Sequence, residues 1–315
     1  MTRIVTVTMN PALDVSADAP AIVPGPKLRC TDARLDPGGG GVNVSRAIRF
    51  LGGHSTALVA AGGITGDLLC ELLAAEGVDV IRQPIGGLTR QSFAVLAADT
   101  GDQYRFVLPG PLWLDQEIAA LFTTIEPHLT DGALIVVSGS LPPGVTPDTL
   151  IRLNRLTRQH GAGLILDTSG AALVQAVATT DTPFHVLRVD GEEADLLAGR
   201  PLDGPQDMAT FGRTLLDQGK ADHIVMAFGA QGTMGLSATD CFFCRPPLIQ
   251  TLSAVGAGDS LVAAVTLALS RGETFRDAVR FGTAAAGAAV MTPATALCEL
   301  EQTERLLPQI EVTPI

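Results

Sequence analysis

Val255-Gly256-Ala257-Gly258-Asp259-Ser260, near the end of a chain of 315 residues, is the stretch that decides the fold. Two glycines one residue apart let the backbone turn sharply and approach a ligand closely. The apolar residues 261–269 follow directly, and Gly272 comes soon after them. This spacing predicts a buried helix that begins at the glycines. The unpaired N–H groups and the dipole at the start of such a helix form an anion-binding hole.

Asp259 stands at the lip of this predicted hole. A carboxylate beside a bound anion can take a proton from a hydroxyl group. An anion cradle next to a general base indicates phosphoryl transfer to an alcohol. The same residues also suit an ordinary tight turn with a helix N-cap, so this stretch alone leaves both interpretations open.

Composition narrows the classes of function. The chain carries a formal net charge of −12 and has no basic run. An acidic surface argues against nucleic acid and against an anionic membrane as the main partner. We expect no signal peptide, because strand-like residues 4–8 come at once, and no membrane span, because the longest apolar stretch is too short to cross a bilayer.

The five cysteines are scattered, and their odd number favours free thiols in a reducing cytoplasm. Cys241 and Cys244 have C-x-x-C spacing, but no second pair and no histidine cluster accompanies them. We therefore expect strand residues there, not a metal or redox site. The five histidines show no ligand spacing.

The order of apolar segments predicts an α/β fold. Segments with helical spacing, such as Val44-Ala47-Ile48-Leu51 and Leu150-Leu153-Leu156, separate many of the predicted strands. Near-continuous apolar strands that alternate with helices indicate a mostly parallel central sheet with helices on both faces. Ligands bind beyond the carboxyl ends of such strands. The predicted strands are residues 4–8, 56–61, 134–137, 164–166, 185–189 and 224–228.

Residues 13–35 and 92–108 break this alternation with short strand-like runs. Thr100-Gly101-Asp102 separates residues 93–96 from 104–108, which is typical of a hairpin. We expect a small second sheet that stands off the main one as a lid, with an uncovered face suited to dimer formation. No linker or repeat is present, so residues 1–315 are expected to form a single domain.

Two early segments are candidate sugar-binding elements. Asp36-Pro37-Gly38-Gly39-Gly40-Gly41-Val42-Asn43 has more glycines than a turn needs, so we expect a ligand loop. Its Asn43 offers a donor and an acceptor to hydroxyl groups, and a Gly-Gly hinge would suit a moving lid. Asp14, where the first strand leaves the main sheet, could hold hydroxyls or simply occupy a turn.

Later strand ends carry further candidates. Ser138 suits a ligand edge and a plain loop equally well. Asp167, Asp190 and Glu193 could together hold water-coordinated Mg²⁺, although Asp167 and Asp190 also suit helix N-caps. The glycine turn Ala227-Phe228-Gly229-Ala230-Gln231-Gly232 fits a nucleotide site or an ordinary strand-to-helix turn.

These motifs, in this order, resemble the ribokinase-like (PfkB) family of sugar kinases over residues 1 to about 300. The resemblance rests on Asn10-Pro11-Ala12-Leu13-Asp14, the Gly38–Asn43 loop, residues 138–142 and, above all, Gly256-Ala257-Gly258-Asp259. Within the family the chain is most similar to the minor-type bacterial 6-phosphofructokinase branch. Further similarity to that branch lies in Lys27-Leu28-Arg29-Cys30, the four glycines, Thr89-Arg90-Gln91 and residues 103–107.

The resemblance implies an ATP- and Mg²⁺-dependent kinase that phosphorylates fructose 6-phosphate, as a homodimer joined through its lids. Asp259 would be the base, and the amides of Gly256, Ala257 and Gly258 would hold the γ-phosphoryl group. Asp167 and Glu193 would act on Mg²⁺ through water. The implied sugar-phosphate residues are Asp14, Gly39, Gly40, Asn43, Arg90 and Ser138, with Lys27 and Arg29 reaching a neighbouring subunit. The implied nucleotide residues are Asp190, Ala227, Gly229, Gly232, Val255 and Thr292.

Four departures from the family pattern fall on the nucleotide side. Arg188-Val189-Asp190 stands where the family has Lys-Pro-Asn, and Asp190 adds a negative charge near the expected ATP phosphates. Ala227 and Ala254 replace hydroxyl residues, and Thr292 stands where asparagine is common.

Rival interpretations therefore stay open. The related branches for fructose 1-phosphate and tagatose 6-phosphate usually have a lysine within the glycine loop, where this chain has Gly40, and this difference favours fructose 6-phosphate. The departures on the nucleotide side also leave a different phosphoryl donor, or a weakened paralogue that only binds a phosphosugar, as alternatives.

Overall fold

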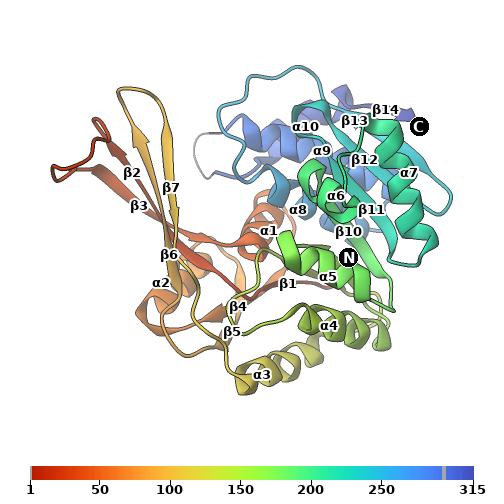
Figure 1. The fold of residues 1–315 in the computed structure, drawn as a ribbon, viewed down its shortest axis with the longest axis horizontal. Coiled ribbons are helices and arrows are strands. Elements are labelled where there is room, and N and C mark those ends of the chain that lie inside the picture. Colours follow the sequence, from red (N-terminus) through yellow and green to blue (C-terminus); the bar gives the residue numbers. More distant parts are fainter. Residues whose placement is uncertain (1, 293–295) are drawn as a thin grey trace.

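A computed structural model of the chain describes residues 2–292 and 296–315. Its main body is a ten-stranded sheet that is sandwiched between helices (Figure 1). Seven neighbouring strands are parallel, and three antiparallel strands extend one edge. In spatial order the strands are β14 (Glu311–Pro314), β13 (Cys241–Arg245), β12 (Thr233–Ser237), β11 (Ala221–Ala227), β10 (Phe184–Asp190), β9 (Gly163–Asp167), β8 (Leu134–Ser138), β1 (Ile4–Thr8), β4 (Thr56–Ala61) and β5 (Asp79–Pro84).

The central strands are buried along their whole length, which explains their unbroken apolar sequences. Every residue of β1, β8 and β9 is buried, as expected for parallel strands that are covered on both faces. The predicted strands therefore all form, and the predicted mostly parallel sheet is confirmed.

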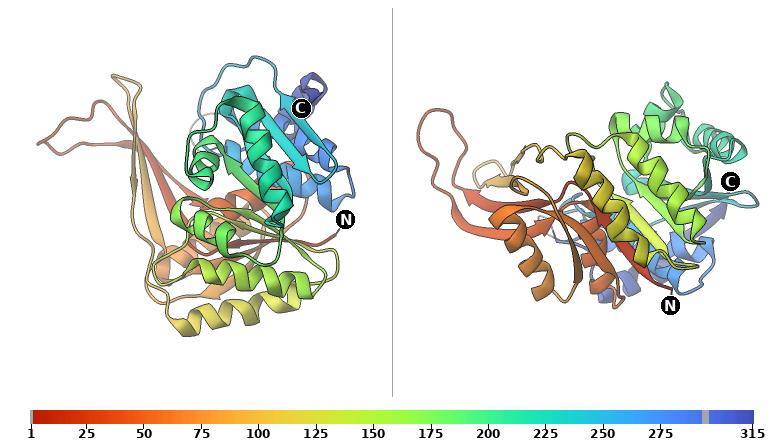
Figure 2. Two further views of the ribbon diagram at one scale, coloured as in Figure 1. Left: turned by 45° about the vertical axis from the view of Figure 1, so that its right-hand side comes forward. Right: turned by 90° about the horizontal axis from the view of Figure 1, so that it is seen from below.

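Helices cover the two faces of this sheet and enclose two large apolar cores (Figures 1 and 2). One face carries α3 (Asp115–Ile125), α4 (Pro147–Gln159), α5 (Gly170–Thr179), α6 (Gly191–Ala198) and α7 (Gly204–Asp217). The other carries α1 (Gly40–Phe50), α2 (Gly63–Ala75), α8 (Ala257–Ser270), α9 (Phe275–Val290) and α10 (Leu300–Leu306). The apolar run after the Gly-x-Gly motif is thus the buried helix α8, which packs between α1 and α9.

A separate four-stranded sheet stands off the main body, as predicted for the lid (Figure 2). Its strands lie in the order β3 (Thr31–Gly38), β2 (Ala12–Ala19), β6 (Arg90–Ala97) and β7 (Gln103–Val107). The predicted hairpin is the antiparallel pair β6 and β7. Because side chains alternate along strands, Asp14, Ser92 and Arg105 face one side of this sheet, and Phe93 and Phe106 face the other.

The antiparallel edge of the main sheet was not predicted. Cys241 and Cys244 are buried free cysteines in β13, so the expectation of strand residues there is confirmed.

Among residues 2–292 and 296–315, no helix has the length and apolar character that a bilayer crossing requires.

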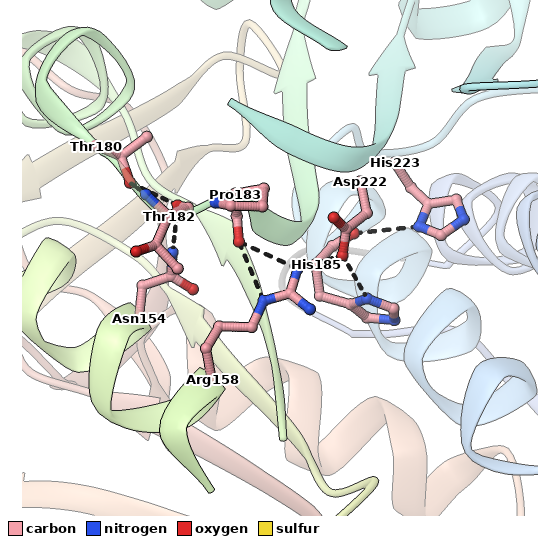
Figure 3. A network of polar contacts seen from close by, with 8 residues as sticks. All are labelled: Asn154, Arg158, Thr180, Thr182, Pro183, His185, Asp222 and His223. Carbon is pink, nitrogen blue, oxygen red and sulfur yellow. Dashed lines mark hydrogen bonds and ion pairs between the residues drawn. The ribbon is translucent and has the colours of Figure 1, made fainter. Parts of the chain in front are cut away.

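A polar network joins α4 to the amino-terminal ends of β10 and β11, opposite the ligand edge (Figure 3). Asp222 accepts hydrogen bonds from Arg158 and, at 3.3 Å, from Nδ1 of His185. The Nδ1 of His223 lies 3.2 Å from the carbonyl oxygen of His185. His185 and His223 thus take part in the contacts that join the start of β10 to the start of β11.

Candidate active site

The amino terminus of α8 faces a cavity between the main body and the lid sheet. Gly256 caps the helix in the left-handed conformation, with φ of 79°, which favours glycine. Gly256 and Asp259, in the first turn, both line the cavity. The start of the helix, with its dipole, thus faces the cavity beside a carboxylate, and the binding of an anion by its first N–H groups stays a prediction.

Asp259 is held by a residue that lies more than two hundred positions away in the sequence. Nδ2 of Asn43, in the first turn of α1, donates to Oδ2 of Asp259 at 2.9 Å. Burial raises the pKa of Asp259 to about 7, and the charge of Asp167 acts in the same direction, whereas the Asn43 hydrogen bond and Arg188 lower it. A carboxylate whose pKa lies near neutrality is suited to general-base catalysis at physiological pH.

The cavity measures about 310 Å³ and is lined mainly by polar side chains. This volume and this lining suit a small polar ligand. The lid sheet and the helices of the main body both contribute, since the walls come from β2, β3, β6, β7, α1 and the start of α8. The charged and polar lining residues are Asp14, Asp36, Asn43, Arg46, Arg90, Ser92, Arg105 and Asp259.

Two arginines on the lid sheet give the far wall of the cavity its positive charge. Arg90 donates to the main-chain carbonyl oxygens of Asn10 and Leu108, at 3.2–3.3 Å. Burial lowers its pKa, against the attraction of Asp14. Arg105, on β7, faces the same cavity. In contrast, Arg46 donates from Nε and Nη2 to the carboxylate of Glu76, at 2.6 and 2.7 Å, and from Nη1 to the carbonyl oxygen of Pro37.

The four-glycine loop packs directly against the backbone of other ligand-edge segments. A Cβ atom at Gly40 would lie 2.3 Å from Oγ of Ser138 and 2.6 Å from the backbone nitrogen of Gly139. A Cβ at Gly38 would lie 2.0 Å from Oδ2 of Asp14. Close packing, more than mobility, therefore requires these glycines. Burial raises the pKa of Asp14 to about 6, although Arg90 and Arg105 act to lower it.

Ser138 ends β8 but lies outside the cavity lining. Its Oγ is buried and donates to Oδ2 of Asp167 at 2.7 Å. The neighbouring Ser140 accepts a hydrogen bond from Nδ2 of Asn10, whose carbonyl oxygen binds Arg90. Ser138 is therefore connected to the arginine wall only indirectly, and its contact with a sugar phosphate stays a prediction.

The three acidic residues at later strand ends gather around one guanidinium. Nη1 of Arg188 lies 3.1 Å from Oδ1 of Asp167 and 3.6 Å from Oε2 of Glu193. Asp190 caps α6 and forms a capping box with Glu193, whereas Asp167 caps no helix. Burial raises the pKa of Glu193. Asp190 is thus a helix N-cap, which is one of the two interpretations given above. It also lies on the expected nucleotide side of the site.

The carboxylate oxygens of Asp167 and Glu193 suit a Mg²⁺ ion that is already bound to nucleotide phosphates and keeps part of its water shell. They do not form a cage for an ion without a nucleotide. Within the described part of the chain, no three His, Cys, Asp or Glu side chains are grouped as metal ligands. The assignment of Asp167 and Glu193 to Mg²⁺ stays a prediction.

The expected nucleotide residues lie beside β11 and α8. Ala227 ends β11, and Gly229 begins the short 3₁₀ turn that follows. Gly232 has φ of 131°, and a Cβ there would lie 2.2 Å from the carbonyl oxygen of Cys244. Val255 lines the cavity. Thr292 donates to the carbonyl oxygen of Ala289, at 2.7 Å, in the turn after α9.

Lys27 and Arg29 lie apart from this site. Both are exposed in the loop that joins β2 and β3 at the far tip of the lid (Figure 2). Neither lines the cavity of its own chain. Their implied reach toward a neighbouring subunit stays a prediction.

Sequence reasoning assigned no role to four charged or polar residues of the cavity wall: Asp36, Arg46, Ser92 and Arg105. The alternating sequences of the lid strands could have indicated two of them, Ser92 and Arg105. Residues at every second position of β6 and β7 share a face, so Arg90, Ser92 and Arg105 could have been grouped once the hairpin register was known. No sequence signal pointed to Arg46.

Comparison with known proteins places this site in a family. Residues 4–302 match the pfkB family carbohydrate kinases. The chain belongs to the pfkB family of carbohydrate kinases. A relative in this family, ATP-dependent 6-phosphofructokinase isozyme 2 of Escherichia coli K12, is 39% identical over 306 residues, which cover 97% of this chain and 98% of the relative. The enzyme of the same name from Mycobacterium tuberculosis CDC 1551 is 40% identical and covers 96% of this chain and 88% of its own length.

Solved structures of the pfkB family agree. Phosphofructokinase-2 of E. coli in complex with potassium superimposes with a TM-score of 0.92 at 39% identity, covering 98% of this chain and 99% of that chain. The complex of that enzyme with fructose 6-phosphate gives a TM-score of 0.90 at 38% identity, with the same coverage. This pfkB-family kinase therefore has the ribokinase-like fold and is a phosphotransferase that uses ATP as substrate.

Proposed function

We propose that this pfkB-family kinase transfers the γ-phosphoryl group of ATP to O1 of fructose 6-phosphate. The observation that carries the proposal is the position of Asp259. It stands at the start of α8, is bound by Asn43, and faces a cavity whose far wall holds Arg90 and Arg105. A base and a helix start on the main body, and two cations on the lid sheet, fit an acceptor that carries both a hydroxyl and a phosphate.

The reaction follows from this arrangement. Asp259 accepts the proton of the O1 hydroxyl as the oxygen attacks the γ-phosphorus. A P–O bond to the sugar forms, the bond to the β,γ-bridging oxygen breaks, and ADP leaves. The amides of Gly256, Ala257 and Gly258 stabilise the charge on the moving phosphoryl group. Asp167 and Glu193 would hold Mg²⁺ through water, and the ion would supply charge neutralisation to the nucleotide phosphates.

The remaining side chains position the acceptor. Asp14, Asn43 and the Gly39 backbone bind sugar hydroxyls at the cavity floor. Arg90 and Arg105 bind the 6-phosphate, because guanidinium groups donate paired hydrogen bonds to phosphate oxygens. Lys27 and Arg29 of a second subunit complete the site across a lid-to-lid dimer. Asp190, Ala227, Gly229, Gly232, Val255 and Thr292 bind the nucleotide.

The free cysteine thiols of the chain suit an enzyme of the reducing cytoplasm.

A lid dimer is supported by the outer face of the small sheet. Phe106 is 55% exposed and Tyr104 is 39% exposed on the face that points away from the cavity. Contiguous exposed apolar side chains on a sheet mark an interaction surface. Phosphofructokinase-2 of E. coli has a tetrameric inhibited form, so larger assemblies exist among relatives.

The packing of Gly40 bears on the choice of sugar. A side chain at this position would collide with Ser138 and Gly139, so the lysine of the related branches has no room here. This favours fructose 6-phosphate over fructose 1-phosphate and tagatose 6-phosphate. The 1-phosphofructokinase of Bacillus subtilis is 28% identical, a weaker likeness than that of the two 6-phosphofructokinases.

Substitution of the base tests the proposal. Asp259→Asn keeps the shape of the side chain but removes the proton acceptor, so turnover is expected to fall about a hundredfold or more. Fructose 6-phosphate binding, measured by calorimetry, should persist. Asp36→Asn, which removes another carboxylate from the same cavity, is the matched control and should lower turnover less than about tenfold. Near-wild-type turnover of Asp259→Asn would remove Asp259 from the role of base.

A further inference from the structure

Thr89 stands directly before Arg90, the first residue of the lid strand β6, and is buried, with 2% of its surface exposed. Its N–H donates to the carbonyl oxygen of Gly62 at 2.9 Å, and its hydroxyl oxygen accepts from the N–H of Gly62 at 3.0 Å. Its carbonyl oxygen accepts from the hydroxyl of Thr65 at 2.8 Å. The N–H, the C=O and the hydroxyl oxygen of Thr89 thus all contact the start of α2.

The segment that Thr89 contacts belongs to the framework of the main body. Gly62 is the N-cap of α2 and follows β4 at the ligand edge of the main sheet. Its carbonyl oxygen also accepts from the N–H of Gly66 at 3.2 Å, within the first turn of the helix. A Cβ atom at Gly66 would lie 2.8 Å from the hydroxyl oxygen of Thr89, so this oxygen packs directly against the helix. The start of a lid strand is therefore joined to a helix of the main body.

The guanidinium of Arg90, which lines the cavity, is held by two main-chain carbonyl groups. Nε and Nη2 donate to the carbonyl oxygen of Asn10, and Nη1 donates to that of Leu108, at 3.2–3.3 Å. These bonds use three of the five N–H groups of a guanidinium and leave two for a ligand. Because both acceptors are main-chain atoms, a shift of the Arg90 backbone would break these bonds or turn the two remaining N–H groups.

We propose that Thr89 is a positioning residue for Arg90. It fixes the first residue of β6 against α2, and so holds the guanidinium where its two remaining N–H groups meet the phosphate of the acceptor. Thr89 itself lies outside the cavity lining, so it acts only through its neighbour. This inference rests on the proposed function, which assigns the 6-phosphate to Arg90 and Arg105.

The hydroxyl oxygen is the part of Thr89 that a substitution can remove by itself. Thr89→Val keeps the branched shape of the side chain, but it takes the hydroxyl acceptor away from the N–H of Gly62. An unsatisfied buried donor is costly, so we expect this N–H to move toward another acceptor or a water molecule. The movement passes to Arg90, the next residue along the chain. Displacement of a positioned group by about 1 Å can cost roughly a hundredfold, and we expect a smaller effect here.

The first test needs no ligand and follows the Nε–H group of Arg90 in nitrogen-15 NMR spectra. This group donates to Asn10, so its exchange with solvent should be slow in the wild type. Arg90→Lys lacks the signal and thus identifies it. Thr89→Val should speed this exchange about threefold or more, whereas Thr89→Ser, which keeps the hydroxyl, should exchange like the wild type. An unchanged exchange rate in Thr89→Val would refute the proposal.

The second test measures the affinity for fructose 6-phosphate by calorimetry, without nucleotide. Thr89→Val should raise Kd about tenfold, and Thr89→Ser should change it less than about twofold. In an Arg90→Met background, the further change Thr89→Val should alter Kd by less than about twofold, because Thr89 acts through Arg90. A full additional loss in that background would show that Thr89 acts by another route, which would overturn the proposal.

Thr180→Val is the matched control. Thr180 is also a buried threonine, in the turn between α5 and β10 and away from the cavity (Figure 3). Its hydroxyl accepts from the N–H of Thr182 at 3.3 Å and donates to the carbonyl oxygen of the same residue at 2.6 Å. Thr180→Val should lower the melting temperature, as Thr89→Val does, but it should leave both the Arg90 exchange and Kd unchanged. Equal effects of the two valine variants on Kd would show that affinity follows stability alone, against the proposal.

Failure of the proposed function has a different signature. A wild type that binds no fructose 6-phosphate would contradict the assigned acceptor, and the exchange rate of Arg90 would then decide the role of Thr89 by itself. Normal binding and turnover in the wild type, with unchanged exchange and Kd in Thr89→Val, would refute the role of Thr89 and leave the proposed reaction standing.

Discussion

Replacement of Asn43 by alanine tests the link between the α1 helix start and the proposed base. The amide donates to Asp259 at 2.9 Å and is one of the interactions that lower the pKa of this carboxyl group, which burial raises to about 7. With that value, about half of the Asp259 carboxylates are ionised at pH 7. Since only the ionised form can accept a proton, kcat/KM of the wild type should fall about tenfold between pH 8 and pH 6.

The size of the effect follows from the hydrogen bond. A bond to a charged group contributes about 1.5–3 kcal/mol, which corresponds to a pKa change of about 1–2 units. Asn43→Ala should therefore move the acidic limb of the kcat/KM profile upward by about 1–2 pH units. At pH 7 the smaller ionised fraction alone lowers kcat/KM about 5–50-fold, in addition to any loss of sugar contacts.

The assay is kcat/KM for fructose 6-phosphate across the pH range, at low ATP so that the free enzyme is observed. Ser45→Ala is the matched control on the same helix, because Ser45 bonds to Thr6 at 2.8 Å and to Ser55 at 3.0 Å, away from the cavity. Its acidic limb should stay in place. An unmoved or lowered limb in Asn43→Ala would refute the coupling between Asn43 and Asp259.

Three further predictions concern packing, acid stability and assembly. Gly40→Ala places a methyl group 2.3 Å from Oγ of Ser138, so it should cost about 1–3 kcal/mol and lower both the melting temperature and kcat/KM, whereas Gly191→Ala, with open space around it, should lower neither. A Gly40→Ala protein as stable and active as the wild type would contradict the close packing. Asp222→Asn should lower stability at pH 7 by about 1 kcal/mol in denaturant titrations, because Asp222 accepts from Arg158 and His185. Burial opposes ionisation of Asp222, but these hydrogen bonds lower its pKa, so its contribution is present above its ordinary pKa and lost as pH falls through the lowered one. The variant should thus lose less stability on acidification than the wild type, and an equal loss would show that the network does not govern acid stability. Phe106→Asp, on the outer lid face, should halve the mass measured by light scattering, whereas Ile64→Asp, an exposed apolar residue on α2, should not; an unchanged mass for Phe106→Asp would place the dimer contact elsewhere.

Much of the fold could be predicted because the central strands obey one simple rule. Strands such as β1 and β8 are buried on both faces, so their sequences are apolar throughout, and their order along the chain implies the parallel sheet. The hairpin of the lid was predictable for a different reason, since its turn carries a glycine between two alternating runs.

The antiparallel edge could not be predicted in the same way. β14 has only four residues and is mostly exposed, so it lacks the apolar pattern that identifies a strand. It forms because β13 offers an unpaired edge, a partnership between segments that are distant in sequence. Such pairings leave little trace in local composition.

The site shows a similar division. Asp259, Asn43 and Asp14 were predictable as ligand-edge residues, and the structure brings all three to one cavity. The Asn43–Asp259 hydrogen bond was not predictable, because it depends on how α1 and α8 pack. The bridge formed by Arg188 depends likewise on the side-by-side placement of β9, β10 and α6.

The central claim is most directly tested by ADP release from Mg-ATP in the presence of separate hexose phosphates. The account predicts the highest kcat/KM with fructose 6-phosphate, and a product that carries phosphate on both C1 and C6 in its phosphorus NMR spectrum. Preference for fructose 1-phosphate or tagatose 6-phosphate would contradict the assigned acceptor. No ADP release with any of these sugars, together with a thermal shift for a sugar phosphate but none for Mg-ATP, would contradict the kinase activity itself.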